Sequence, residues 1–118
     1  MSTTNELPAL DSELLNGYVE TLGRNVVEQM FTLYCQQSAI YLNDIEAALG
    51  NDSKQQWQEH CHKMKGAVGS VGLKALHGRL VAMEKSTEGA TKKAQLLAEL
   101  IEHNQQAIVD FQDWLKSL

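Results

Sequence analysis

Residues 60–72 decide the fold, and they read His60-Cys61-His62-Lys63-Met64-Lys65-Gly66-Ala67-Val68-Gly69-Ser70-Val71-Gly72. On a helix that turns about 100° per residue, the apolar side chains of this stretch and of Trp57 fall within roughly 80° of one another. They are Trp57, Cys61, Met64, Val68 and Val71. Such a stripe is typical of an amphipathic helix that packs one face against a core.

The opposite face of this helix is unusually bare. His62 lies about 140° from Trp57 on the helical wheel, and Lys65, Gly66 and Gly69 share its outward direction. Each glycine inside a helix costs about 1 kcal/mol relative to alanine, but it lets another backbone come close to the imidazole. Lys65 adds positive charge one turn away. We infer that His62 is presented to a partner and handles an anionic group.

The motif His62-x-x-Lys65-Gly66, with Gly72 further on, resembles the signature of histidine phosphotransfer (HPt) domains of bacterial two-component phosphorelays. The run from His62 to Leu73 especially resembles the HPt domain that ends Arc-type hybrid sensor kinases. The helical pattern on either side also fits, so the resemblance covers roughly residues 10–118. It implies a phosphorelay intermediate that takes a phosphoryl group on His62 from a receiver-domain aspartate of a hybrid sensor kinase and passes it to a response regulator. An Arc-type response regulator is the suspected partner.

Length and composition predict one small all-α domain. The chain has 118 residues with 43% hydrophobic content, which is enough for a single core. The one proline, Pro8, lies near the start, so nothing after it blocks long helices. We expect residues 1–8 to form a flexible N-terminus and residues 9–118 to form the HPt domain.

Charge and cysteine usage narrow the classes of partner. The net charge of −5 argues against nucleic acid or an anionic membrane surface, and no apolar run approaches the roughly 20 residues of a membrane span. The polar N-terminus is unlike a secretory signal. Cys35 and Cys61 each fall in an apolar stripe, which predicts buried thiols in a reducing cytoplasm. We therefore expect a cytoplasmic monomer and, because the sequence begins with methionine and fits one domain, a free-standing protein.

Helical periodicity and break signals predict an antiparallel up-down four-helix bundle with a short extra N-terminal helix. Asp11 or Ser12 should cap a short helix that runs through Leu22 and carries Leu14, Leu15, Tyr18 and Leu22 on one side. Breaks at residue 23, residues 50–53, residues 70–73 and residues 88–91 separate the elements. The bundle helices are predicted at about 25–49, 54–70, 74–85 and after residue 91.

Glu84 is predicted to lie level with His62. If the third and fourth bundle segments form a hairpin centred near Leu73, His62 lies eleven residues before the bend and Glu84 eleven after it. Glu84 would then accept a hydrogen bond from Nδ1–H of His62 and fix the tautomer with the Nε2 lone pair facing out. HPt domains often carry Gln or Glu here, and the Arc-type relative has Gln. The alternative is that Glu84 is only a solvated helix charge.

The expected chemistry is phosphoryl transfer without autonomous kinase activity. Such transfer is loose and in line, so positioning and charge stabilisation supply most of the catalysis. The sequence has no glycine-rich phosphate loop and no acidic cluster for Mg²⁺. We therefore expect no cofactor on this chain, with Mg²⁺ on the partner receiver domain, and we expect Lys65 to contact the phosphoryl oxygens. The residues predicted to dock the partner are Gln58, Glu59, Gly66, Gly69 and Ser70.

Other interpretations stay open at several positions. Gly69 alternatively permits close approach of a neighbouring helix, and Gly72 alternatively serves only the helix end. The whole chain could be a non-catalytic bundle that docks on receivers or kinases without carrying phosphate. A metal-binding bundle using His60 and His62 is disfavoured, because zinc ligands on a helix are spaced by three or four residues. We expect no metal site, and we expect His60 to be structural.

Overall fold

The computed structural model describes residues 8–118, and within that range it contains helices and no strand. The helices are α1 (Ser12–Leu22), α2 (Arg24–Gly50), α3 (Lys54–Ser70), α4 (Lys74–Glu84) and α5 (Ala90–Lys116). The predicted all-α class is confirmed, and the helix ends lie within one or two residues of the expected ones. The predicted flexible N-terminus, apart from Pro8, lies outside the described residues.

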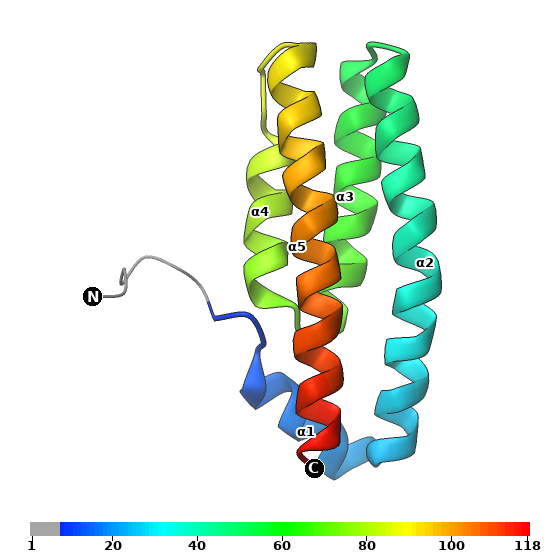
Figure 1. Cartoon of the computed structure of the whole chain (residues 1–118). Coiled ribbons are helices and arrows are strands. Elements are labelled where there is room, and N and C mark those ends of the chain that lie inside the picture. The colour runs from blue at the N-terminus through cyan, green and yellow to red at the C-terminus, as the bar shows by residue number, and fades with distance from the viewer. Residues whose placement is uncertain (1–7) are drawn as a thin grey trace, which may run out of the picture.

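Helices α2, α3, α4 and α5 form a closed bundle, and α1 covers one end of it. α3 contacts α2 and α4, while α5 contacts α2 and α4 from the other side. Figure 1 shows these four helices running along one long axis, with α1 lying across the lower end, where α2 begins and α5 ends. The predicted antiparallel bundle with a short N-terminal helix is therefore confirmed.

Local sequence signals set the helix boundaries. The side chain of Asp11 accepts a hydrogen bond from the Leu14 amide at 3.1 Å, and the hydroxyl of Ser53 accepts one from the Gln56 amide at 3.2 Å. Both are N-caps that satisfy an amide at the start of a helix. Gly23, with φ of 88°, adopts a backbone conformation that few other residues tolerate. It separates α1 from α2.

The core is built from apolar side chains of all five helices. The stripe predicted from residues 57–71 is confirmed, because each of its five members is buried. The Trp57 indole donates a hydrogen bond from Nε1 to the Met83 carbonyl at 2.8 Å, which ties α3 to α4. On the far side of the bundle, Phe31 of α2 stacks on Phe111 of α5 with ring centroids 4.5 Å apart.

Two residues are more exposed than the apolar residues grouped with them. Leu22, which shares one side of the short helix with Leu14, Leu15 and Tyr18, is 47% exposed, because it is the last residue of α1 and the chain turns away at Gly23. Cys35 was expected to be buried, but it is half-buried and lies at the edge of the core. Cys61 is buried as expected.

α1 is fastened to the turn between α3 and α4. The Tyr18 hydroxyl donates to the Ser70 carbonyl at 3.0 Å, and the Asp11 amide donates to the Gly72 carbonyl at 2.8 Å. Gly72 has φ of 71°, and a Cβ on it would meet the side chain of Leu15 at 3.0 Å. The alternative prediction, that Gly72 serves the helix end, therefore matches its geometry.

Polar groups inside the bundle were not foreseen from the sequence. The Tyr34 hydroxyl donates to Oδ1 of Asn104 at 2.6 Å, and Nδ2 of Asn104 donates to the Ser38 hydroxyl at 3.2 Å. These residues join α2 to α5 in the core. Lys93 is also buried, with its ammonium 5.1 Å from the centre of the Trp57 ring.

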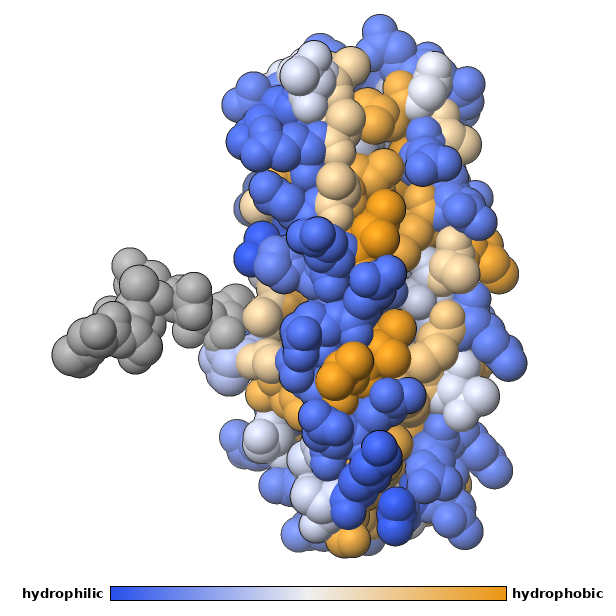
Figure 2. Space-filling model, viewed as in Figure 1, coloured by the Kyte–Doolittle hydropathy of each residue, from blue (hydrophilic) through white to orange (hydrophobic). Residues whose placement is uncertain are grey.

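Figure 2 shows apolar surface between α5 and α2, bordered by hydrophilic residues.

Candidate functional site

The α3–α4 hairpin brings His62 and Glu84 together. Nδ1 of His62 lies 3.3 Å from Oε1 and 3.2 Å from Oε2 of Glu84. The Trp57 hydrogen bond to Met83 fixes α4 at the residue just before Glu84. The predicted contact between the carboxylate and Nδ1 is therefore confirmed, and its role in function stays a prediction.

His62 is exposed, unlike the apolar residues beside it on α3. The side chain is 67% exposed, whereas Cys61 and Met64, which face the core, are fully buried. Because Nδ1 faces a carboxylate, a neutral ring carries its proton there and presents the lone pair of Nε2. The arrangement supplies a nucleophilic nitrogen at the surface of the bundle.

Glu84 holds two cationic or potentially cationic groups. Its Oε1 lies 2.7 Å from Nζ of Lys65, in addition to the contact with His62. The hydrogen bond from Lys65, helped by that from His62, holds the pKa of the Glu84 carboxyl below its usual range. Glu84 is therefore ionised at neutral pH and acts only as a hydrogen-bond acceptor.

Lys65 is engaged with Glu84. Its side chain is largely covered, at 23% exposed, and its ammonium is bound to the carboxylate one helical turn from His62. We expected Lys65 to reach phosphoryl oxygens. To do so, the ammonium has to share or leave the carboxylate, so the predicted contact requires a rearrangement of this side chain.

The two helical glycines near His62 have different surroundings. Gly66 is exposed, and no described atom beyond its own helix backbone and chain neighbours lies within 4 Å of a Cβ built there. Gly69 is half-buried, and its Cβ would lie 3.1 Å from Cδ2 of His77 on α4. Gly66 thus fits the predicted bare approach to His62, whereas the geometry of Gly69 fits the alternative of close helix contact.

The remaining predicted docking residues are all exposed. Glu59 accepts a hydrogen bond from the Gln55 side chain at 3.2 Å within α3. The Ser70 hydroxyl donates to the Ala67 carbonyl at 2.8 Å. Gln58 lies one residue before Glu59 on the same helix. Their accessibility is compatible with docking, and their roles stay predictions.

His60 does not join His62 in a single site. Nδ1 of His60 lies 3.9 Å from Oδ2 of Asp44 on α2, whereas His62 pairs with Glu84 on α4. Within residues 8–118 no group of three or more His, Cys, Asp or Glu side chains is arranged to hold a metal ion. The two rings therefore serve separate contacts on different sides of α3.

Cys61, next to His62 in sequence, is not a second nucleophile. Burial raises the pKa of its thiol to about 12, with the nearby Glu84 carboxylate adding to the effect. A thiol reacts as the thiolate, so this group is inert near neutral pH. Cys61 therefore does not compete with the predicted role of His62.

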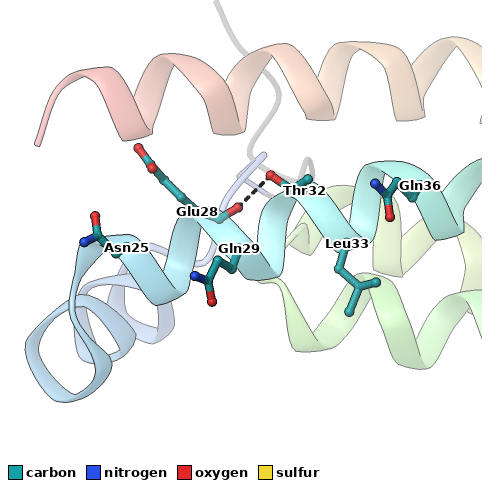
Figure 3. Close-up of a pocket in the computed structure, with 6 residues that line it drawn as sticks. All are labelled: Asn25, Glu28, Gln29, Thr32, Leu33 and Gln36. Carbon is teal, nitrogen blue, oxygen red and sulfur yellow. Dashed lines mark hydrogen bonds between the residues drawn. The ribbon is translucent and has the colours of Figure 1, made fainter.

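A surface hollow elsewhere lacks comparable chemistry. It has a volume of about 500 Å³ and is lined by residues of α2 alone. Figure 3 shows their side chains spread along one helix, with a hydrogen bond from the Thr32 hydroxyl to the Glu28 carbonyl. The lining residues are Asn25, Glu28, Gln29, Thr32, Leu33 and Gln36. No histidine or cysteine is among them.

Within residues 8–118, no helix combines the length and apolar character needed to cross a bilayer.

The chain is similar to known proteins in sequence and in fold. The family model of the Hpt domain matches residues 29–115. Over 67 residues, or 57% of this chain, the sequence is 34% identical to the aerobic respiration control sensor protein ArcB of Escherichia coli O157:H7, and the match takes in 9% of that protein's length. The solved histidine-containing phosphotransfer domain of ArcB from Escherichia coli has a TM-score of 0.82 at 23% identity, covering 92% of this chain and 94% of that one.

The family match spans α3 and α4 completely, so it includes His62, Lys65 and Glu84. The likeness to the solved domain shows that the bundle has the same fold. The chain therefore belongs to the Hpt domain family, and its general role is histidine phosphotransfer in phosphorelay signalling.

Proposed function

We propose that this chain is a phosphorelay intermediate that reversibly accepts a phosphoryl group on Nε2 of His62. The donor is a receiver-domain aspartate of a hybrid sensor kinase, and the acceptor is the receiver domain of a response regulator. One observation carries the proposal. His62 is 67% exposed while its Nδ1 faces the Glu84 carboxylate at 3.2 Å, which leaves Nε2 to meet a phosphoryl group.

Transfer follows from this geometry by in-line displacement. The Nε2 lone pair forms a bond to phosphorus as the bond from phosphorus to the aspartate oxygen breaks. Glu84 orients the ring and offsets the positive charge that the imidazole gains. Lys65, once released from Glu84, stabilises the equatorial phosphoryl oxygens. The receiver supplies the aspartate and Mg²⁺, so this chain acts as a phosphohistidine carrier without kinase activity of its own.

The bare surface at Gly66 supports docking of a receiver close to His62. The open space around Gly66 permits a partner backbone to approach the helix. Gln58, Glu59 and Ser70 would add polar contacts at the edge of this surface, as suits a transient interface of modest area.

The proposed partners are receivers of the Arc type. The similarity to the aerobic respiration control sensor ArcB supports this choice. We also propose that the chain acts as a monomer in the cytoplasm. Phosphotransfer to a panel of purified receivers would identify the cognate pair, and equally slow transfer to all of them, including Arc-type receivers, would contradict the choice.

The proposal is tested with purified chain and a phosphorylated receiver. Wild-type chain should gain acid-labile, alkali-stable phosphate, as phosphohistidine does. His62→Gln should abolish it, and His60→Gln, which alters the neighbouring ring on another side of α3, should keep it. Phosphate on His62→Gln, or none on the wild type with any receiver, would refute the proposal. A His62→Gln variant that still binds receivers and retains function would favour a docking bundle without phosphotransfer.

A further inference from the structure

We infer that Glu84 keeps the Nδ1 proton on His62 after Nε2 is phosphorylated, and that it thereby makes the phosphohistidine short-lived and ready to transfer. This inference rests on the proposed function and concerns the same site. It assigns to Glu84 a positioning role with a chemical consequence, namely the choice between a transfer-ready and a storage form of the phosphorylated ring.

The geometry leaves one place for a proton in the His62–Glu84 contact. Both carboxylate oxygens lie within 3.3 Å of Nδ1, and Oε1 also accepts from Lys65 at 2.7 Å. An ionised carboxylate has only acceptor atoms, so each contact requires a donor on the other side. Charge-assisted hydrogen bonds of this kind are stronger than neutral ones. The contact therefore favours a ring that carries a proton on Nδ1.

That proton decides how easily the phosphoryl group leaves. When the P–N bond breaks, its electron pair returns to Nε2 as a bond forms between phosphorus and the oxygen of the acceptor. If Nδ1 holds its proton, the leaving group is neutral imidazole. If Nδ1 has lost it, the leaving group is an imidazolate anion, which leaves far less readily. The same balance applies when water is the acceptor, in which case inorganic phosphate is released.

A glutamine at this position would act differently. Its amide has a carbonyl acceptor and an NH₂ donor on one group. The NH₂ can donate to an unprotonated Nδ1 and so stabilise the neutral phosphorylated ring. Glu84→Gln is nearly isosteric, so it exchanges a contact that retains the proton for one that tolerates its loss, without removing the side chain from α4.

Other charged groups near His62 do not replace Glu84. α3 packs against α2 and α4. From α2, Asp44 approaches His60, with 3.9 Å between Oδ2 and Nδ1. From the end of α4, Glu84 is followed by Lys85, which is exposed. The ionisable residues of α3 within four positions of His62 are Glu59, His60, Cys61, Lys63 and Lys65, of which Lys65 pairs with Glu84.

The test uses phosphoramidate, a small phosphoryl donor, so that no receiver is needed. Wild-type chain, Glu84→Gln and Glu102→Gln are phosphorylated, freed of donor and followed by ³¹P NMR from about pH 5 to 9. Glu102→Gln is the matched control, because it removes the same charge from an exposed position on α5. Near pH 8 we expect Glu84→Gln to lengthen the phosphohistidine lifetime by about three- to tenfold. The control should match the wild type.

A second readout separates proton retention from simple positioning. In ¹⁵N spectra of the phosphorylated chain, the wild type should keep a proton on Nδ1 of His62 to higher pH than Glu84→Gln does. Equal lifetimes and equal pH profiles for the two proteins would overturn the inference, as would a His62 that phosphoramidate leaves unmodified. If the lifetimes differ as expected but no receiver transfers phosphate to the chain, the proposed function fails and the assignment to Glu84 stands.

Discussion

Replacing Gly66 should make the protein more stable and slower in phosphotransfer. Gly66 lies inside α3 on the exposed side, and a Cβ there meets no described atom outside its own helix and chain neighbours within 4 Å. The two substitutions of interest are Gly66→Ala, which adds only a methyl group, and Gly66→Gln, which adds a long side chain beside His62. Both lie in ordinary helical backbone, so neither is strained.

The stability change follows from helix propensity. Alanine is favoured over glycine by about 1 kcal/mol inside a helix, and glutamine by somewhat less. With no clash to offset this gain, Gly66→Ala should raise the melting temperature by about 3–6 °C for a domain of this size. Gly66→Gln should raise it by roughly half as much. Thermal unfolding followed by circular dichroism measures both.

The transfer rate should move in the opposite direction. On the wheel, residue 66 lies about 40° from His62 and one turn along α3. A glutamine there has to be ordered or displaced when a receiver docks, which costs about 0.5–1.5 kcal/mol, and it also blocks the close backbone approach. We expect Gly66→Gln to slow transfer from a phosphorylated receiver by about tenfold or more. Gly66→Ala should slow it much less.

Gly17 provides the matched control. It lies inside α1, its Cβ position is equally open among the described residues, and it is on another helix from His62. Gly17→Ala should stabilise the chain by a similar amount and leave transfer unchanged. The reasoning is refuted if Gly66→Gln transfers at the wild-type rate, or if Gly66→Ala destabilises the fold.

Three further outcomes follow from the core and the turns. Asn104→Leu leaves the buried Tyr34 hydroxyl without its acceptor and removes the donor to the Ser38 hydroxyl, which keeps its bond to the Cys35 carbonyl. Urea unfolding should therefore show a loss of about 1–3 kcal/mol, and an unchanged midpoint would contradict the buried network. Gly72→Ala should lose at least about 1 kcal/mol in the same assay, because φ is 71° and Leu15 lies 3.0 Å from the added Cβ. Burial raises the pKa of Cys61 to about 12 and also raises that of the less buried Cys35, so near pH 8 iodoacetamide should modify Cys35 first and Cys61 only on unfolding, as peptide mass analysis would show.

Local signals in the sequence were sufficient for the helices and for the central contact of the site. Asp11 and Ser53 cap helices as their residue types predict. The equal spacing of His62 and Glu84 about Leu73 led to a contact that the structure has at 3.2 Å. Both results depend on short-range periodicity, which a hairpin converts directly into spatial proximity.

Features that depend on distant parts of the chain were not predicted. Asn104 and Tyr34 are 70 residues apart, and nothing in either local pattern indicates that they meet. Nothing in the local sequence indicates that the bundle covers Lys93 beside Trp57. Lys65 was expected to point toward a phosphoryl group, whereas an intramolecular carboxylate on α4 holds it. Its placement depends on the neighbouring helix as well as on its own.

The hydrogen bond from the Trp57 indole to the Met83 carbonyl gives the protein an intrinsic optical reporter. Because the acceptor is the residue just before Glu84, a shift of the end of α4 would change the emission of Trp57. The chain has one other tryptophan, Trp114, and a Trp114→Phe variant would isolate the signal. Fluorescence in a stopped-flow mixer could then follow movement of the end of α4 relative to α3 in real time while a receiver binds, without an attached dye.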